Sequence, residues 1–295
     1  MDQPFHDGEI EAQRLAGESE EAAFNGRALS DEIVRGALPF IGQQPFFLAA
    51  TLDAAGRPWT WIVAGEPGFA QAPSTHSVRV DGEHLTLLAD ELLTHLGTDS
   101  RIGLLFFEPR TRRRLRVNGH ARLTTDGGFE VRVVQAFPNC PKYIQPRVLA
   151  PRPVGALAQR SSSGSGLTPE ILAFVRRADT FFVASRGPDG GLDVSHRGGA
   201  PGFVESMRDG ALRIPDYPGN SMFNTFGNLL RDPRAGLLFA DFEHGHVLRL
   251  TGRARLDFAD ATQVGELATG RAWSFAPEEW RLVESELPFR LMRIA

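Results

Sequence analysis

The residues best suited to chemistry are three consecutive polar side chains, Ser195, His196 and Arg197, followed by Gly198 and Gly199. A hydroxyl, an imidazole and a guanidinium beside uncovered backbone can bind an anion or a polar heteroaromatic ring. His196 is also the best candidate for proton transfer, because the unperturbed pKa of histidine lies near neutrality. The alternative interpretation is that these residues bind no ligand and that Arg197 only faces solvent.

A second polar group follows in residues 215–230, PDYPGNSMFNTFGNLL. Asn220 is predicted to cap a helix, on which Asn224 and Asn228 lie one turn apart on a face separate from the apolar residues. A helix N-terminus with polar side chains favours phosphate. The simpler interpretation is a turn and a cap with no ligand.

The third candidate group, residues 140–143, contains residue types that are rare in this chain. Its 32 basic residues include a single lysine, Lys142, and it has one cysteine, Cys140, and two tyrosines, Tyr143 and Tyr217. A lone cysteine excludes an intramolecular disulfide and a cysteine-rich zinc module, and suits a reducing compartment. Lys142 and Tyr143 either reach a ligand or cap a connection between domains.

Two other polar clusters are weaker candidates. The histidines at 244 and 246 lack a convincing third ligand, so no metal site is predicted. The simplest interpretation of the arginines at 110, 112, 113, 114 and 116 is a solvated hairpin. The alternative, phosphate recognition, is not supported by interleaved aromatic residues.

These groups belong to a chain that repeats itself, which points to two similar domains. Three pairs of segments match, at offsets of 135, 133 and 133: 45–50 with 180–185, 101–106 with 234–239, and 115–123 with 248–256. The segment in copy one that corresponds to 193–199 is 58–64, PWTWIVA, which lacks the polar trio. Copy two also carries five extra residues within 215–230. Because functional sites break local symmetry, the site is predicted in copy two.

Each copy is expected to contain a helix followed by short antiparallel strands. Ser30 is predicted to cap a helix over 31–38, and Thr168 one that begins at Pro169. The strands alternate apolar and polar residues, as in half-buried antiparallel sheets. The fold class is therefore mainly β, with two tandem small barrels and flanking helices. The predicted boundaries are 1–27 for an N-terminal extension, 28–150 for the first barrel, 151–166 for a linker and 167–295 for the second barrel.

The overall composition is that of an ordinary globular protein, with 295 residues, 42% hydrophobic and 23% charged, and a net charge of -4. The acidic balance argues against nucleic acid as the main partner. The sequence contains no uninterrupted apolar run of about 18 residues, so no membrane-spanning helix is expected. The polar, acidic start fits no signal peptide, and a cytoplasmic location is expected.

The order of these motifs resembles the pyridoxamine 5′-phosphate oxidase-like FMN-binding split-barrel proteins, and most closely a bacterial branch with tandem barrels. The motifs are SHRGG at 195–199, PDYPGN at 215–220, FNT and GN at 223–228, the matched strands, and NCPKYIQ at 139–145. The resemblance covers about residues 30 to 290. It implies split barrels that form a pseudo-dimer within one chain, with FMN at their junction.

The resemblance also assigns roles to individual residues. Ser195, His196 and Arg197 would line the flavin ring and phosphate, and Pro215, Asp216 and Tyr217 the edge beside the ring. The phosphate and ribityl chain would be held by Asn220, Asn224, Thr225 and Asn228. From the first half, Lys142, Tyr143 and Gln145 would reach across, with Lys142 near the flavin N1 and a tyrosine stacked on the ring.

The implied activity is FMN-dependent oxidoreduction of a small molecule, with electrons from NAD(P)H or a separate reductase. Residues 279–284, EWRLVE, only superficially echo the substrate-phosphate motif of true pyridoxamine phosphate oxidases, so vitamin B6 oxidation is not expected. A non-catalytic flavin- or haem-binding module is the main alternative, and a barrel pair that serves only in assembly is another. The protein would be a monomeric pseudo-dimer or a homodimer.

Overall fold

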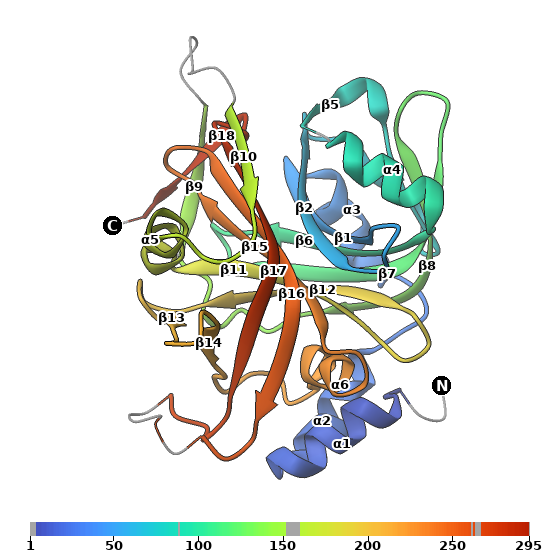
Figure 1. The fold of residues 1–295 in the computed structure, drawn as a ribbon. Helices are drawn as coiled ribbons and strands as arrows, with labels where there is room; N and C mark the ends of the chain where they lie inside the picture. The colour runs from blue at the N-terminus through green and yellow to red at the C-terminus, as the bar shows by residue number, and fades with distance from the viewer. Residues whose placement is uncertain (1–3, 88, 152–159, 261, 263–266, 295) are drawn as a thin grey trace.

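The computed structural model describes residues 4–87, 89–151, 160–260, 262 and 267–294. Within these ranges the protein consists of two curled antiparallel sheets that pack against each other, with helices at their edges (Figure 1). None of the described helices has the length and apolarity that crossing a bilayer requires. The helices are α1 (Asp7–Ala16), α2 (Ser19–Asn25), η1 (Gly26–Ala28), η2 (Arg35–Ala37), α3 (Leu38–Gly42), η3 (Gly82–His84), α4 (Asp90–Thr98), α5 (Pro169–Arg177) and α6 (Asn224–Arg231).

The first sheet forms one split barrel, with strand order β3-β4-β8-β7-β6-β1-β2-β5. Its strands are β1 (Phe46–Leu52), β2 (Pro58–Gly65), β3 (Ala70–Ser74), β4 (Ser77–Val80), β5 (Leu85–Leu87), β6 (Arg101–Glu108), β7 (Arg113–Leu123) and β8 (Phe129–Pro138). Phe47, Trp59 and Phe106 lie in the core that it encloses. The predicted helix over 31–38 is wrong, because Ser30 is held extended by a bridge to Ala136, and the α-helical segment begins only at Leu38.

The second sheet forms the other barrel, with strand order β12-β11-β15-β16-β17-β14-β13 and with β10 paired to β17. Its strands are β10 (Arg160–Gly164), β11 (Thr180–Arg186), β12 (Leu192–Gly198), β13 (Glu205–Ser206), β14 (Leu212–Pro215), β15 (Arg234–Asp241), β16 (His246–Asp257) and β17 (Ala272–Glu284). Phe181, Phe239 and Trp273 lie in its core. The helix predicted after Thr168 is confirmed as α5, whose first turn receives the Thr168 side chain as its cap.

The segment between the barrels contains more structure than a linker. Residues 152–159 of the predicted linker 151–166 lie outside the described residues. Strand β10, at its other end, pairs with β17 along its whole length, so this part of the prediction is corrected to an edge strand of the second barrel. The strand before the linker, β9 (Arg147–Pro151), pairs with the C-terminal strand β18 (Phe289–Arg293).

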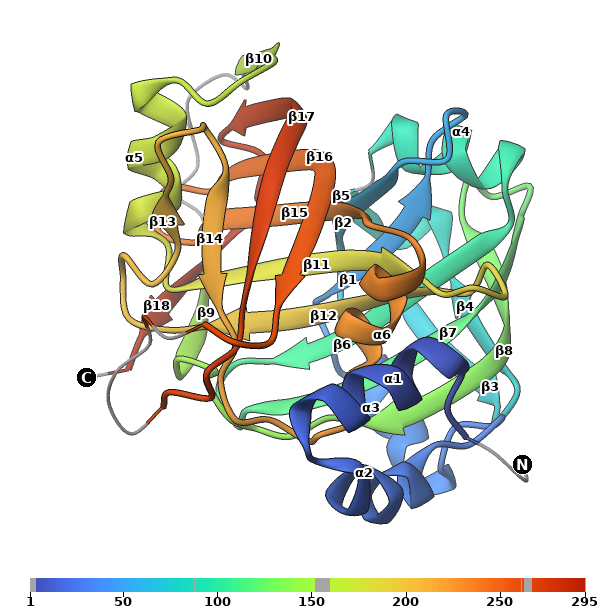
Figure 2. The same ribbon diagram turned by 60° about the horizontal axis from the view of Figure 1, so that its bottom comes forward.

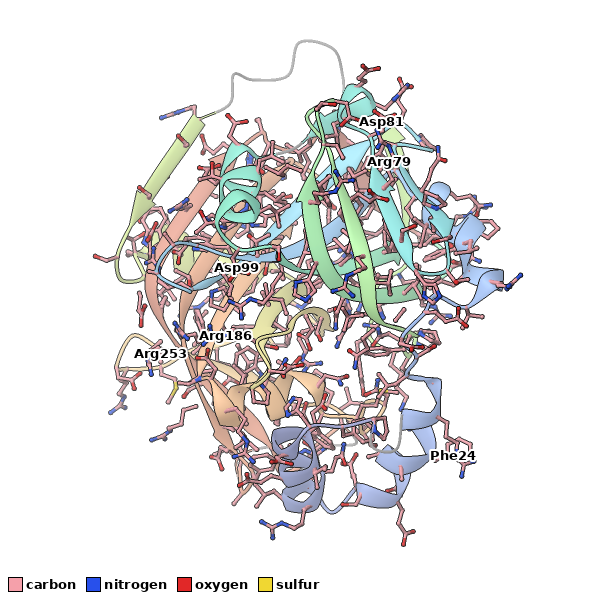
Figure 3. All side chains as sticks on the ribbon, turned by 90° about the vertical axis from the view of Figure 1, so that its right-hand side faces the viewer. Phe24, Arg79, Asp81, Asp99, Arg186 and Arg253 are labelled. Carbon is pink, nitrogen blue, oxygen red and sulfur yellow. The ribbon has the colours of Figure 1, made fainter. Side chains whose placement is uncertain are left out.

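The two barrels meet through a third apolar core, which includes Phe46, Phe182 and Phe289. Equivalent contacts cross this interface in both directions. Arg101 of β6 donates to the carbonyl of Gly190 at 3.2 Å, and its counterpart Arg234 of β15 donates to the carbonyl of Ala55 at 3.5 Å. Figure 3 shows Asp99 of the first barrel and Arg186 of the second close together at this seam. The interface therefore has the symmetry of a pseudo-dimer within one chain.

Strand pairing corrects the alignment of the two copies by one residue. Leu104 pairs with Ala49, and the equivalent residue Leu237 pairs with Val183. The offset between β1 and β11 is therefore 134 rather than 135. A shift of one residue exchanges the two faces of a strand, so only this alignment places equivalent side chains in equivalent cores.

Candidate functional site

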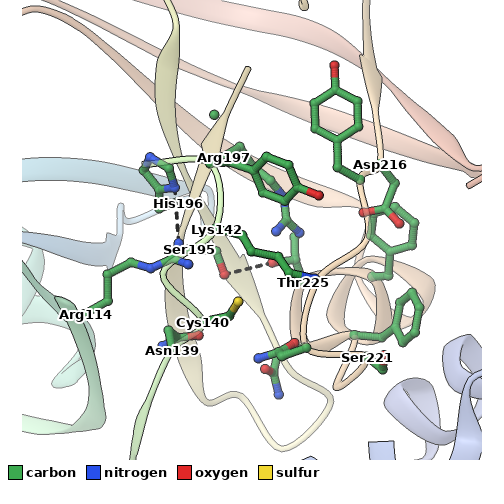
Figure 4. Close-up of a pocket in the computed structure, with 18 of the residues that line it drawn as sticks. Arg114, Asn139, Cys140, Lys142, Ser195, His196, Arg197, Asp216, Ser221 and Thr225 are labelled. Carbon is green, nitrogen blue, oxygen red and sulfur yellow. Dashed lines mark hydrogen bonds between the residues drawn. The ribbon is translucent and has the colours of Figure 1, made fainter. Parts of the chain in front are cut away.

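A cavity lies at the junction of the barrels, beside β12 (Figure 4). All the predicted site residues line it except Asn228 and Gln145. Those that it brings together are Lys142, Tyr143, Ser195, His196, Arg197, Pro215, Asp216, Tyr217, Asn220, Asn224 and Thr225. Residues that we did not predict also line it, among them Glu18, Arg114, Arg116, Asn139, Cys140, Ser221, Phe223 and Arg271.

The floor of the cavity is a hydrogen-bonded network on β12. The Ser195 hydroxyl oxygen accepts hydrogen bonds from Arg116 and from Thr225, the latter at 3.0 Å. Asp193 forms a buried salt bridge with Arg116 at 3.1 Å. Asn228 donates to Asp193 at 3.2 Å, so its side chain supports β12 from behind and does not reach the cavity. Asn228, predicted to hold the ligand, is therefore placed behind the cavity wall and not among the residues that line it.

In the first barrel, two tryptophans occupy the strand positions equivalent to Asp193 and Ser195. The corrected alignment matches Asp193 with Trp59, whose cross-strand partners are Ser185 and Thr51. It matches Ser195 with Trp61, whose partners are Val183 and Ala49. Both indole rings are buried, and Arg281 and Arg249 of the second barrel lie over them, 4.3 and 4.9 Å from the ring centroids. In the first barrel, the two indole rings thus occupy the region that corresponds to the polar floor of the cavity in the second barrel.

His196 is held as a neutral imidazole. Its Nδ1 accepts a hydrogen bond from Arg114 at 3.1 Å, and its ring stacks on Phe107 with centroids 5.3 Å apart. An arginine can only donate, so the ring proton must lie on Nε2, which has no partner among the described residues. Burial, then the charges of Arg114, Arg197 and Arg147, hold the pKa of His196 well below its ordinary value. This environment disfavours protonation of His196 near neutrality, which the predicted role in proton transfer would require.

This low pKa predicts a specific loss of stability in acid. The unfolded chain binds a proton at His196 near pH 6.5 and the folded chain does not, so the free energy of unfolding falls as pH drops below about 6.5, by about 1.4 kcal/mol per pH unit. His196→Gln keeps an acceptor for Arg114 but cannot be protonated. In urea unfolding between pH 7 and 5, this variant should lose the part of the pH dependence of the free energy of unfolding that His196 contributes. The exposed-histidine control His120→Gln should keep it. Equal slopes in the wild type and His196→Gln would contradict the assignment.

The segment that contains the extra residues begins its helix later than predicted. Asn220 is not the N-cap, since α6 begins at Asn224 and Phe223 precedes it with a left-handed φ of 57°. The Asn220 side chain instead accepts a hydrogen bond from the Met222 amide at 3.2 Å, which forms a turn before the helix. Ser221, in the same turn, also has a positive φ, of 58°. Strained backbone of this kind concentrates at functional sites.

The segment that follows the first barrel crosses β12 and closes one side of the cavity. Tyr143 has a φ of 64°, and its hydroxyl donates to the carbonyl of Pro218 at 2.9 Å. Its ring lies 5.3 Å from the ring of Tyr217, centroid to centroid. The backbone passes so close to Gly198 that a Cβ there would be 2.1 Å from the Tyr143 carbonyl oxygen. Lys142 is exposed at the cavity mouth, whereas Gln145 is half-buried and does not line the cavity.

Two arginines of the basic run, Arg114 and Arg116, enter this cavity instead of forming a solvated hairpin. They lie on β7, where Leu115 and Val117 point into the core of the first barrel. Alternation along the strand therefore turns both arginines toward the second barrel. The alternating sequence Arg-Leu-Arg-Val could have indicated that both arginines lie on one face of a strand.

The N-terminal extension also builds part of the cavity wall. Helix α1 packs against α6 where Gly8 meets Gly227, since a Cβ on Gly8 would be 2.3 Å from the Gly227 carbonyl oxygen (Figure 2). Beyond α1, Glu18 reaches the cavity and forms a salt bridge with Arg271 at 2.8 Å. Arg271 also pairs with Asp216 at 2.9 Å. No motif in the sequence connected these segments.

The cavity carries unmet hydrogen-bonding capacity and an excess of positive charge. Within the described residues, the buried Nε atoms of Arg114, Arg116 and Arg197 and the amide nitrogen of Asn139 have no partner. Burial lowers the pKa of Arg114 to about 10, so this side chain remains charged at neutral pH, and burial also lowers the pKa of Arg197. Buried cationic donors without partners are costly unless a ligand compensates them. The wall is thus suited to an anionic ligand with a polar ring.

Comparison with known proteins agrees with the architecture. Residues 167–284 match the family model described as pyridoxamine 5′-phosphate oxidase, and no curated protein matches the chain. One similar solved structure is a putative pyridoxamine 5′-phosphate oxidase from Lactobacillus delbrueckii, with 17% identity, coverage of 39% of this chain and 93% of that chain, and a TM-score of 0.32. A NimC/NimA family protein from Clostridium acetobutylicum has 15% identity, coverage of 42% of this chain and 91% of that chain, and a TM-score of 0.30. The heme storage protein HutZ from Vibrio cholerae has 16% identity, coverage of 40% of this chain and 95% of that chain, and a TM-score of 0.29. The family match covers the second of the two curled sheets, so this half of the chain is identified with the pyridoxamine 5′-phosphate oxidase-like split-barrel superfamily.

Proposed function

We propose that the cavity binds one FMN and that the protein is an FMN-dependent oxidoreductase acting on a small molecule. The observation that carries this proposal is the cationic wall of a cavity in a barrel of this superfamily. Arginine and lysine side chains outnumber the carboxylates around it. The cations are Arg114, Arg116, Lys142, Arg197 and Arg271, and the carboxylates are Glu18, Asp216 and, behind the wall, Asp193. A phosphate monoester, with about -1.5 to -2 charges at neutral pH, suits such a site.

The phosphate would be held where β12 meets α6. Ser195 accepts two hydrogen bonds, from Arg116 and Thr225, so its own proton remains to be donated to a ligand. The Nε atom of Arg197 has no partner within the described residues, and its guanidinium is stabilised by the nearby charge of Asp216. A guanidinium and a hydroxyl at the start of a helix together favour a doubly charged oxyanion.

The ring of the flavin would lie toward the two tyrosines. Tyr143 and Tyr217 present aromatic faces at an angle of 37° on this side of the cavity. Lys142 at the mouth can stabilise negative charge on a ring, as preorganised cations do. FMN, when bound, supplies reversible two-electron transfer, while the residues of this chain bind it, orient it and limit the access of water.

Binding affinity tests the proposal. We expect purified protein to bind FMN with quenching of flavin fluorescence. Arg197→Met should weaken the affinity at least about thirtyfold, because the loss of a buried charged partner costs about 2 kcal/mol or more. The matched control is Arg253→Met, since Arg253 points to solvent from the second barrel (Figure 3). Thermal unfolding of both variants checks that each remains folded.

Three outcomes would contradict the proposal: no FMN binding by the wild type, equal affinities in the two variants, or a Soret band with haem in place of a flavin spectrum. Anaerobic mixing of the FMN-loaded protein with NADH or NADPH then tests catalysis. We expect the flavin absorbance near 450 nm, a general property of oxidised flavin, to bleach with one of them or with a separate reductase. If none of these donors reduces the flavin, the protein binds flavin without acting as an oxidoreductase.

A further inference from the structure

We propose that Arg114 binds a carboxylate of the second reactant, so that the substrate is a small carboxylic acid. This inference rests on the proposed FMN site and adds the chemical class of the molecule that meets the flavin there. Arg114 comes from β7 of the first barrel and enters the cavity from the side opposite Asp216 (Figure 4).

Two arginines of the cavity, Arg114 and Arg197, form no salt bridge within the described residues, but only Arg197 is stabilised by the charge of a nearby carboxylate, that of Asp216. Arg116 is neutralised by Asp193, and Arg271 by Asp216 and Glu18. Arg114 forms no salt bridge within the described residues, and its one hydrogen bond is donated to a neutral ring, that of His196. A half-buried cation without a counter-charge is costly to the folded protein unless a ligand supplies one.

The remaining donors of Arg114 have the geometry that a carboxylate requires. Its Nη1 is directed to His196, which leaves the edge formed by Nε and Nη2. The Nε atom is buried and has no partner within the described chain. Two parallel N–H groups on one edge of a guanidinium match the two oxygens of a carboxylate.

Asn139 provides an independent second donor beside Arg114. Its backbone amide donates to the carbonyl of Arg114 at 3.1 Å, so the two residues are neighbours across the end of the β7–β8 pair. The amide nitrogen of the Asn139 side chain is buried, has no partner in the described residues, and lines the same cavity. A guanidinium and an amide, both lacking acceptors, thus form a site for one anionic group.

This site is separate from the predicted phosphate site. His196 and Arg197 are consecutive on β12 and point to opposite faces of the strand. Arg114 approaches the His196 face, whereas Arg197 lies toward Asp216. FMN phosphate on the Arg197 side would therefore leave Arg114 to the second reactant.

The test uses FMN-loaded protein, with acetate as the probe, acetamide as its neutral isostere, and inorganic phosphate as the competing oxyanion. We expect acetate to change the flavin absorbance spectrum saturably, whereas acetamide and phosphate do not. Arg114→Gln should weaken the acetate response at least tenfold, while the FMN affinity falls far less than in Arg197→Met. The matched control Arg113→Gln, which removes an exposed arginine of the same strand paired with Glu108, should change neither.

Each contrary outcome has a distinct meaning. Failure of the wild type to bind FMN overturns the proposed function. If FMN binds but acetate gives no response, or responds equally in Arg114→Gln, the carboxylate site is wrong and the FMN site stands. A response to phosphate alone makes the site one for phosphate esters and overturns the carboxylate class. Loss of FMN affinity in Arg114→Gln as large as in Arg197→Met would assign Arg114 to the FMN phosphate and overturn the inference.

Discussion

Asp193→Ala should lower the free energy of unfolding by about 3–5 kcal/mol, the cost of removing one partner of a buried ion pair. Asp193 is 4% exposed and pairs with Arg116, which is 3% exposed and comes from the other barrel. The same carboxylate accepts hydrogen bonds from Ser185 at 2.8 Å and from Asn228. Alanine would leave the Arg116 charge buried without a counter-charge, at the interface of the two barrels. Urea unfolding followed by tryptophan fluorescence measures the loss.

The control for this variant is Asp31→Ala, because Asp31 is exposed. It should change the free energy of unfolding by less than about 0.5 kcal/mol. A loss below about 1 kcal/mol in Asp193→Ala would mean that the network on β12 does not hold the barrels together. The double variant Asp193→Leu with Arg116→Met separates charge from packing, and should recover much of the stability because no buried charge remains unpaired.

Gly198→Ala should displace the Tyr143 segment from β12 and weaken FMN binding at least about tenfold. A methyl group at this position would lie 2.1 Å from the Tyr143 carbonyl oxygen, which is backbone and cannot rotate away. Overpacking of this kind costs about 1–3 kcal/mol, and 1.4 kcal/mol corresponds to a factor of ten in affinity. Flavin fluorescence quenching measures the affinity.

Gly36→Ala is the matched control, because a Cβ on Gly36 meets no atom within 4 Å. It should bind FMN like the wild type. If Gly198→Ala also binds FMN normally, then the close crossing of Tyr143 over β12 is not needed for the site. A crystal structure of that variant would show whether the segment has moved.

The repeat and the polar motif of β12 were predictable because they depend on local sequence. Matching strands have the same residue types at nearly constant spacing, and Ser195 and Arg197 face the cavity through simple alternation. The exact alignment of β1 with β11 was not predictable, since two adjacent phenylalanines in each strand allow either offset. Pairing with the neighbouring strands decides between them.

The missed residues are those that come from distant segments. Arg114 and Glu18 reach the cavity from β7 and from the N-terminal helices, and nothing near them in sequence marks a ligand site. Packing also overrode a local expectation at His196, where burial beside Arg114 and Phe107 keeps the ring neutral. Sequence gives the usual pKa of a histidine, whereas tertiary contacts determine the actual one.

The central claim is that one barrel of the pair holds FMN and the other does not. Its direct test is the stoichiometry of an FMN titration of the wild-type chain, with protein concentration well above the dissociation constant. We predict one FMN per chain of 295 residues, because Trp59 and Trp61 fill the equivalent position in the first barrel. An equivalence point at two FMN per chain, or the absence of any binding, would contradict the account.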